Sequence, residues 1–248
     1  MMDGWAQLKE VSEKIKLSGQ LWVGANYTDT NSGAYQEDAD DFTVNRFSLD
    51  IEAQVTDQVR AFATLLLEDA GGNSENVAGA ENLILDEAYL EIGDDDGIYG
   101  KVGRQYLPFG SGINATYSDL AIGQVWINDP AALSASEMRD TALVLGIRNE
   151  NFNLAGFAFN PTATSTAAGR NNITTYGVSA TYKVEGEDLS YKIGAGYTNN
   201  LYSIQMASAG AAAAATSYTD ELEGIDLFAT MTAGPVALSI EWVTATQD

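Results

Sequence analysis

Cysteine and histidine are both missing from this chain of 248 residues. Their absence excludes disulfides, thiolate nucleophiles, a Ser-His-Asp triad and the usual cysteine and histidine sites for zinc or copper. Basic residues are few: 12 Lys and Arg stand against 35 Asp and Glu, so the formal net charge is −23. Nucleic acids bind to clustered Lys and Arg, and a nucleic-acid partner is therefore not expected. Because the sequence shows no defined pocket or base network, we expect neither an enzyme nor a cofactor.

Long hydrophobic runs are missing as well. No stretch approaches the ~18 apolar residues that a membrane-spanning helix needs, so a helical membrane protein is excluded. The sequence contains instead eleven segments in which apolar and polar residues alternate, as Ile15 and Leu17 alternate with Lys16 and Ser18. A period of two is typical of a β-strand with one apolar face. The expected strands are 15–27, 46–55, 59–68, 83–92, 98–107, 141–149, 152–160, 174–183, 189–198, 225–232 and 236–245.

The connections between these segments alternate in length. The long ones are 28–42, 69–82, 108–140, 161–173 and 199–223, and the short ones are 56–58, 93–97, 150–151, 184–188 and 233–235. A transmembrane β-barrel has tight periplasmic turns at one rim and long extracellular loops at the other. The sequence therefore predicts an all-β fold, an antiparallel up-and-down barrel in the bacterial outer membrane, with membrane lipid as a partner.

The expected domain organisation follows from the same pattern. Residues 1–14 read as a short amphipathic periplasmic helix, and residues 15–248 read as the barrel. Single-chain bacterial barrels have an even number of strands, whereas eleven strands are visible here. We therefore expect at least one further C-terminal strand beyond this sequence. An exported barrel also needs a signal peptide, and the opening Met-Met-Asp-Gly-Trp does not resemble one.

Charged residues on the expected lumen-facing positions are nearly balanced. They are Asp50, Glu52, Glu68, Glu87, Glu91, Asp226 and Glu241 against Lys16, Arg46, Arg60, Lys101, Arg148, Lys183 and Lys192. Segment 108–140 is long for a connection in a compact domain, so it either folds into the lumen or caps the outer rim. The candidate constriction residues are Asp119, Asp129, Glu137 and Arg139 from this segment, and Arg60, Lys101, Arg148, Glu87 and Glu91 from the wall.

Outward-facing aromatic residues fall at two depths, as the two interfaces of a membrane require. Tyr27, Phe47, Tyr176, Tyr197 and Trp242 lie toward the long connections, and Tyr182 and Tyr191 lie toward the short turns.

Three groups of polar residues need separate explanation. The acidic runs 37–41 and 94–96 offer oxygen ligands for a hard cation, but a solvated loop or turn explains them better. Arg104 falls on the lipid-facing parity, which requires a bulge at Gly103 or exit from the bilayer there. Asp86 falls on the same parity near the outer end, where lipid headgroups could solvate it.

Two phrases of the sequence resemble a known family. Segment 86–110 ends in Gly-Arg-Gln-Tyr-Leu-Pro-Phe-Gly, and Trp5 precedes the strand opening Ile-Lys-Leu-Ser-Gly at 15–19. Both are similar to the LbtU family of outer-membrane siderophore porins, and the Gly-Arg-Gln phrase occurs in other porin families too. The resemblance implies a passive channel for small polar solutes, with siderophore or ferric-chelate uptake as the family's function. A non-conducting barrel that acts as a scaffold or adhesin and a soluble β-sandwich are the alternatives. The oligomeric state stays open.

Overall fold

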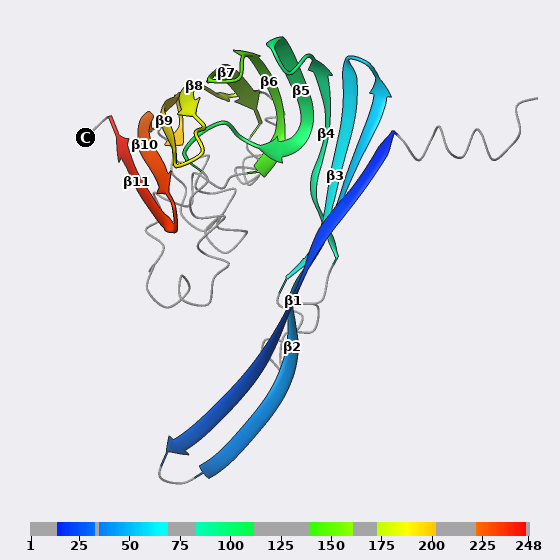
Figure 1. Ribbon diagram of the computed structural model, residues 1–248, viewed down its shortest axis with the longest axis vertical. Coiled ribbons are helices and arrows are strands. Elements are labelled where there is room, and N and C mark those ends of the chain that lie inside the picture. Colours follow the sequence, from blue (N-terminus) through cyan, green and yellow to red (C-terminus); the bar gives the residue numbers. More distant parts are fainter. Residues whose placement is uncertain are drawn as a thin grey trace, which may run out of the picture. The chain divides into compact units, whose positions relative to one another are not determined.

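The computed structural model describes residues 14–32, 35–68, 83–111, 139–160, 173–201 and 222–246, with side chains for all of these except 24–45 and 68. Within these residues, eleven strands form one antiparallel sheet in which neighbours in the sequence are neighbours in the sheet (Figure 1). The strands are β1 (Ile15–Ser32), β2 (Tyr35–Thr56), β3 (Val59–Glu68), β4 (Ile84–Gly93), β5 (Gly97–Tyr106), β6 (Arg139–Arg148), β7 (Phe152–Phe159), β8 (Thr175–Val184), β9 (Leu189–Thr198), β10 (Gly224–Ala233) and β11 (Val236–Ala245).

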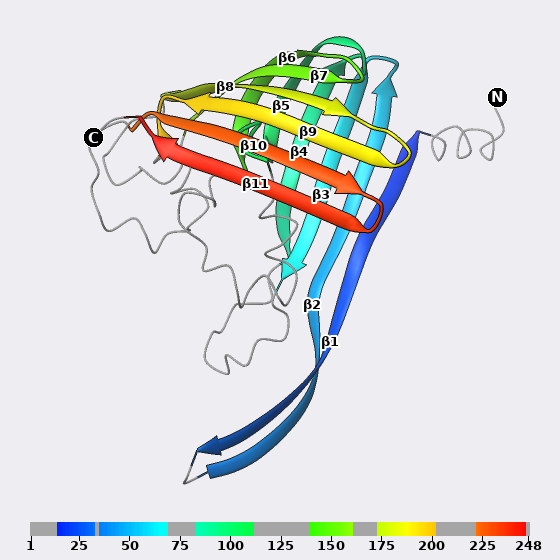
Figure 2. The same cartoon turned by 60° about the vertical axis from the view of Figure 1, so that its left-hand side comes forward.

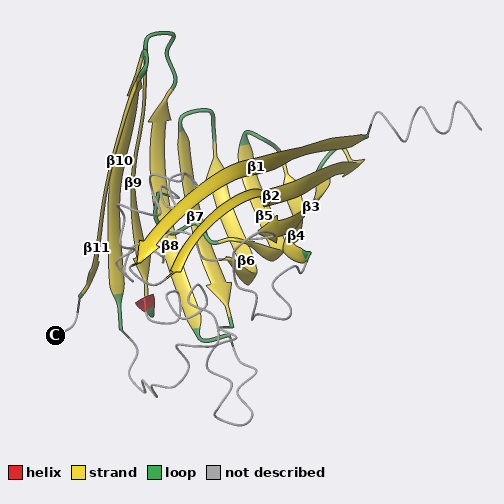
Figure 3. Cartoon of the chain, turned by 90° about the horizontal axis from the view of Figure 1, so that it is seen from below, coloured by secondary structure: helices red, strands yellow, loops and turns green. Residues whose placement is uncertain are grey.

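The expected fold class, an all-β antiparallel sheet in up-and-down order, is confirmed. Figure 3 shows strands and their connecting turns as nearly all of the described chain. Among the described residues no helix has the length and apolar character to cross a membrane. The expected helix at 1–14 lies outside the described residues, apart from Lys14 in a turn. Contacts divide the chain into two units, Met1–Ala88 and Tyr89–Asp248.

The first hairpin of unit Met1–Ala88 corrects one sequence-based expectation. Residues 28–42 were expected to form a long loop, but β1 and β2 pair continuously out to Ser32 and Tyr35. The polar composition of this stretch suggested a loop, whereas the backbone pairing of β1 with β2 continues through it. The acidic run 37–41 therefore lies within β2, opposite 26–30 of β1. Strands of 18 and 22 residues exceed the 9–11 or so that cross a bilayer, so the hairpin extends beyond that length.

Polar pairs follow one face of this unit. The Nζ atom of Lys16 lies 3.2 Å from an oxygen of Glu52, and the Thr64 hydroxyl donates to Asp50 over 2.9 Å. The Asp86 side chain is buried, which differs from the solvation by lipid headgroups that the sequence suggested.

In unit Tyr89–Asp248 the strands follow one another around a curved sheet (Figure 1). The tight turns 94–96, 149–151, 185–188 and 234–235 each join two antiparallel neighbours and lie at one end of the strands. Figure 2 shows this for β8 to β11, whose tight turns lie together at one side. The long connections 107–138, 160–174 and 199–223 begin and end at the opposite end. Within this unit the short turns therefore lie at one end of the strands and the long connections start from the other end, as expected.

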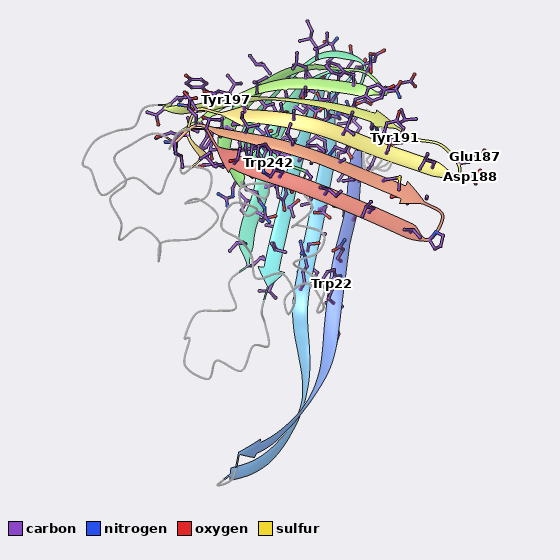
Figure 4. All side chains as sticks on the ribbon, turned by 90° about the vertical axis from the view of Figure 1, so that its left-hand side faces the viewer. Trp22, Glu187, Asp188, Tyr191, Tyr197 and Trp242 are labelled. Atoms are coloured by element: carbon purple, nitrogen blue, oxygen red, sulfur yellow. The ribbon has the colours of Figure 1, made fainter. Side chains whose placement is uncertain are left out.

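The two faces of this curved sheet differ in burial. The face that carries the buried side chains Tyr99, Val144, Phe157 and Phe228 is called the inward face here. The outward face carries exposed apolar side chains at every second position, for example Leu145 (59% exposed) and Ile240 (61% exposed). Figure 4 shows outward aromatics near both ends of the strands, with Tyr197 and Trp242 at one end and Tyr191 at the other, near Glu187 and Asp188. The two expected depths are thus visible on β9 and β11.

The strand at Gly103 runs without a register shift against β6. The ladder is continuous from Gly97↔Arg148 to Tyr106↔Arg139, and Gly103 has a φ of +128°. A bulge in this ladder therefore does not explain the outward-facing Arg104, whose side chain is exposed. Exit from the bilayer near Gly103, the other explanation given above, stays a prediction.

Candidate functional site

A charged cluster lies on the inward face at the short-turn end of β4, β5 and β6. Glu91 of β4 is buried, with only 4% of its side chain exposed. One of its oxygens lies 2.5 Å from Nη2 of Arg148 and the other lies 3.3 Å from Nζ of Lys101. One carboxylate thus holds two cations from neighbouring strands. Arg148 also donates to the backbone oxygen of Asp94 over 3.1 Å, which ties the cluster to the tight turn.

Aromatic rings position these cations. The guanidinium carbon of Arg148 lies 4.4 Å from the centre of the Tyr99 ring, a distance at which cation–π attraction is favourable. The Nζ atom of Lys101 lies 5.2 Å from the ring centre of Tyr89. The Tyr99 hydroxyl donates to the side-chain oxygen of Asn153 over 2.9 Å, which fixes the ring against β7. Three of the predicted wall residues, Glu91, Lys101 and Arg148, therefore form one positioned group.

Replacement of Glu91 by glutamine tests this group. The substitution leaves Arg148 and Lys101 without their shared carboxylate, so we expect a loss of stability of about 1–2 kcal/mol, since both cations are partly solvated. The inward face also gains positive charge, which should shift the ion selectivity of a channel toward anions. Reversal potentials and urea unfolding of the folded protein check the two effects. Asp95→Asn, at an exposed carboxylate beside the same arginine, is the matched control and should leave both measurements nearly unchanged.

Three aromatic rings lie flat on the inward face because each covers a glycine on the adjacent strand. Tyr99 pairs with Gly146, Phe157 with Gly177 and Phe228 with Gly194. A Cβ atom added to any of these glycines would meet the ring at 2.7 Å or less. The missing side chain is what lets the ring lie against the wall, as in other sheets where an aromatic residue covers a glycine.

The chain that follows β5 turns onto the inward face. Leu107 and Phe109 are buried and belong to one apolar cluster with Phe157 and Phe159 of β7. The Phe109 ring lies over Gly196 of β9, where an added Cβ would meet it at 3.1 Å. Figure 1 shows this segment crossing the concave side of the sheet after β5. Residues 107–111 are called the inward segment below.

The inward segment ends on β11. Ser111 donates from its backbone N–H to one oxygen of Glu241 over 2.8 Å, and from its hydroxyl to the other over 2.7 Å. Asp226 of β10 lies beside this contact and is fully buried. Neither of its oxygens accepts a hydrogen bond of normal geometry from the described residues, although the Glu241 carboxyl and the Gly110 backbone are its neighbours.

The other predicted site residues are not among the ion pairs that form the cluster of Glu91, Lys101 and Arg148. Asp119, Asp129 and Glu137 lie outside the described residues. Arg139 begins β6 on the same side as the exposed Leu143, with its guanidinium carbon 4.5 Å from the Tyr106 ring centre, so it does not take the inward position that was expected. In the other unit, Arg60 is half-buried and its guanidinium carbon lies 5.9 Å from the Phe62 ring centre. Glu87 is half-buried on β4.

Sequence reasoning placed Glu241 on the lumen side but assigned it no role, and it assigned none to Ser111. The phrase Pro-Phe-Gly-Ser at 108–111 marked the start of a long connection without indicating its partner. Among the described residues, no group of three or more Asp or Glu side chains is arranged to hold a metal ion.

The sequence matches no protein-family model and no curated protein. Several solved structures are similar, and two of them are forms of OmpT, an outer membrane protein of Vibrio cholerae. One is the loop L8 deletion mutant, with 9% identity and a TM-score of 0.45, and the other is the in-vitro folded trimer form, with 11% identity and a TM-score of 0.44. Each comparison covers 94% of this chain and, respectively, 70% and 66% of the other chain. The fold of this chain is therefore assigned from the strand pairing of its own sheet and not from these two comparisons.

Proposed function

We propose that this chain is part of an outer-membrane β-barrel that conducts small polar solutes by passive diffusion. One observation carries the proposal: the outward face of the sheet is an exposed apolar surface made by every second residue. Leu145, Ile193 and Ile240 are about half exposed or more, and each is a mid-strand residue. Large contiguous apolar surfaces are rarely left in water, and the outer face of a transmembrane barrel has this alternation.

Strand length supports the same placement. In unit Tyr89–Asp248 the complete strands β5 to β11 have eight to ten residues, close to the 9–11 or so that cross a bilayer when tilted. Tyr197 and Trp242 at one end and Tyr191 at the other suit the two membrane interfaces. A tilted strand of this length would put Ile193 near mid-bilayer.

The inward face would set selectivity. Glu91, Lys101 and Arg148 would present fixed charges to a passing solute, as charged side chains do in other channels. Segment 108–140 would fold into the lumen and add the charges of Asp119, Asp129 and Glu137. The inward segment supports this, because the described start of that connection already lies on the inward face. Siderophores or ferric chelates are the solutes that the LbtU resemblance suggests.

The filled inward face favours a second function. Phe109, Phe157 and Phe159 are nearly completely buried, so part of the concave side is occupied by apolar side chains. A barrel that is filled in this way throughout would not conduct, and it would act as a scaffold or adhesin through its extracellular loops.

Single-channel recording from the purified full-length protein in planar bilayers separates the two functions. A channel should give discrete current steps in potassium chloride, whereas a filled barrel should insert and give none. Insertion is verified independently by protection of the strands from protease in lipid vesicles. Protected strands without current steps would reject the channel function and leave the scaffold function.

Neutralising Asp119, Asp129 and Glu137 together to Asn, Asn and Gln tests the contribution of segment 108–140. If these carboxylates line the constriction, we expect the preference for cations over anions to fall, because charges in a confined low-dielectric pathway are weakly screened. The reversal potential across a salt gradient is the measurement. Neutralising Glu185, Glu187 and Asp188 at a tight turn is the matched control. Equal shifts from both triple variants would place the segment at the rim.

A further inference from the structure

The contact between Ser111 and Glu241 joins two parts of the chain that are 130 residues apart in sequence. Both oxygens of the carboxylate are used, one by the backbone N–H and one by the hydroxyl of the same serine. Two donors on one residue fix the orientation of the carboxylate as well as its position. Hydrogen bonds to a charged acceptor are also stronger than neutral ones.

The inward segment has a second attachment two residues earlier. Phe109 is only 1% exposed and its ring lies over Gly196, so the ring packs close to β9 at a position without a side chain. Phe109 and Ser111 therefore attach to β9 and β11, on either side of β10. An apolar contact alone lets a chain slide, whereas the Ser111 contact fixes its register on the wall.

Two other charged residues, Asp226 and Lys192, lie near Glu241, but it is Glu241 that accepts the hydrogen bonds from Ser111. Asp226 is buried beside it, and Lys192 of β9 places its Nζ atom 5.0 Å from the Phe228 ring centre. The ion pairs of the described residues do not include Lys192. Glu241 is half-buried and bonds to Ser111. No lysine or arginine competes with Ser111 for Glu241 among the ion pairs of the described residues.

We propose that Glu241 is a positioning residue of the channel, which fixes Ser111 against β11 and thereby keeps the inward segment on the wall and out of the conducting cross-section. The inference rests on the proposed channel function and adds to it a residue that controls the steadiness of the current. Gly110 and Ser111 lie at the point where the chain would leave the wall if the contact were lost.

Conductance recordings of single-site variants test the role. In Glu241→Ala the serine loses both of its hydrogen bonds to the carboxylate. The time that the inward segment spends detached should then rise by about ten- to a hundredfold, the range expected for loss of hydrogen bonds to a charged group. Current steps should then show flicker that the unmodified protein lacks. Glu241→Gln keeps one acceptor oxygen and should flicker less. Ser111→Ala should resemble Glu241→Gln, because the backbone N–H still donates.

Glu223→Ala is the matched control for charge. Glu223 precedes β10 at the same end of the strands and bonds to Thr246, so its loss removes the same charge without touching the inward segment. If Glu223→Ala flickers as much as Glu241→Ala, the effect is electrostatic and the positioning role is rejected.

A crosslinking arm tests the contact without reference to conductance. The native chain has no cysteine, so the double variant Ser111→Cys with Glu241→Cys has two unique thiols. A reversible bifunctional thiol reagent, about as long as the glutamate side chain it replaces, should join them and abolish the flicker until it is reduced. Absence of the crosslink in the folded protein overturns the inference. A crosslink that forms while Glu241→Ala conducts as steadily as the unmodified protein overturns it too. If the crosslink forms but the inserted protein gives no current, the channel function is rejected and the positioning role falls with it. The contact between residues 111 and 241 would still be supported in that case.

Discussion

Ile193→Arg should lower the stability of the folded protein in a bilayer by about 2–4 kcal/mol, the cost of a charged side chain at mid-bilayer on the lipid face of a barrel. Ile193 is the fifth of ten residues in β9, and its side chain is 48% exposed on the outward face. It pairs with Ala229 of β10 and Tyr182 of β8, so neither residue directly opposite carries a charge. No carboxylate in these two pairs would therefore offset the charge, and lipid on the outward face would exclude water.

Thr181→Arg is the control for this substitution. Thr181 pairs with Gly194, the residue after Ile193, so the two positions have nearly the same depth on opposite faces. Its side chain is on the inward face, where an arginine can reach water, and its stability cost should be below about 1 kcal/mol. Both variants are measured by urea titration of refolding into lipid vesicles. An equal loss of stability at the two positions would contradict the assignment of the outward face to lipid and the inward face to water.

Gly194→Ala should destabilise the protein by about 1–3 kcal/mol, the usual cost of adding volume to a packed site. The added Cβ would meet three atoms of the Phe228 ring, the nearest at 2.3 Å. The ring must then tilt off the wall into the concave side, and in a channel this displacement should also lower the conductance. Urea unfolding and single-channel conductance measure the two effects.

The cost should disappear when the ring is made smaller. The three nearest atoms all belong to the Phe228 side chain, so Phe228→Leu should relieve the strain and the two substitutions should couple in a double-mutant cycle. Gly156→Ala is the control, because an added Cβ there has no neighbour closer than 3.8 Å. Additive effects of Gly194→Ala and Phe228→Leu would mean that the ring does not lie on the glycine.

The sequence predicted strands best where alternation ends at turn residues. The bounds of β3, β9 and β11 agree with the expected 59–68, 189–198 and 236–245. Each has apolar residues at every second position and a tight turn at one end, so both the period and a boundary are explicit in the sequence. The loop expected at 28–42 was wrong because polar residues also occur in a hairpin whose pairing continues.

Contacts on the inward face were harder to predict. The pairs Tyr99 with Gly146, Phe157 with Gly177 and Phe228 with Gly194 all join strands that are linked by long connections. A tight turn fixes the register of its two strands, whereas a long connection leaves it open, so these pairs follow only from the sheet itself. The contact of Ser111 with Glu241 depends in addition on how the sheet curves.

The charged cluster of Glu91, Lys101 and Arg148 could be predicted in part. The sequence placed Glu91, Lys101 and Arg148 on the inward side from strand parity alone, and the structure joins them in one group. Parity could not show that Tyr99 and Asn153 position them. It also placed Asp86 on an outward position, where the structure buries the side chain.

The central claim is that the outward face of the sheet contacts lipid and the inward face contacts water. Site-directed spin labels placed one at a time along β11 in lipid vesicles test it most directly. Labels at 236, 238, 240 and 242 should collide mainly with oxygen, which dissolves in the bilayer, and labels at 237, 239, 241 and 243 mainly with a water-soluble nickel chelate. Such a period of two would support the claim. Equal access of the nickel chelate to both sets along the whole strand would contradict it.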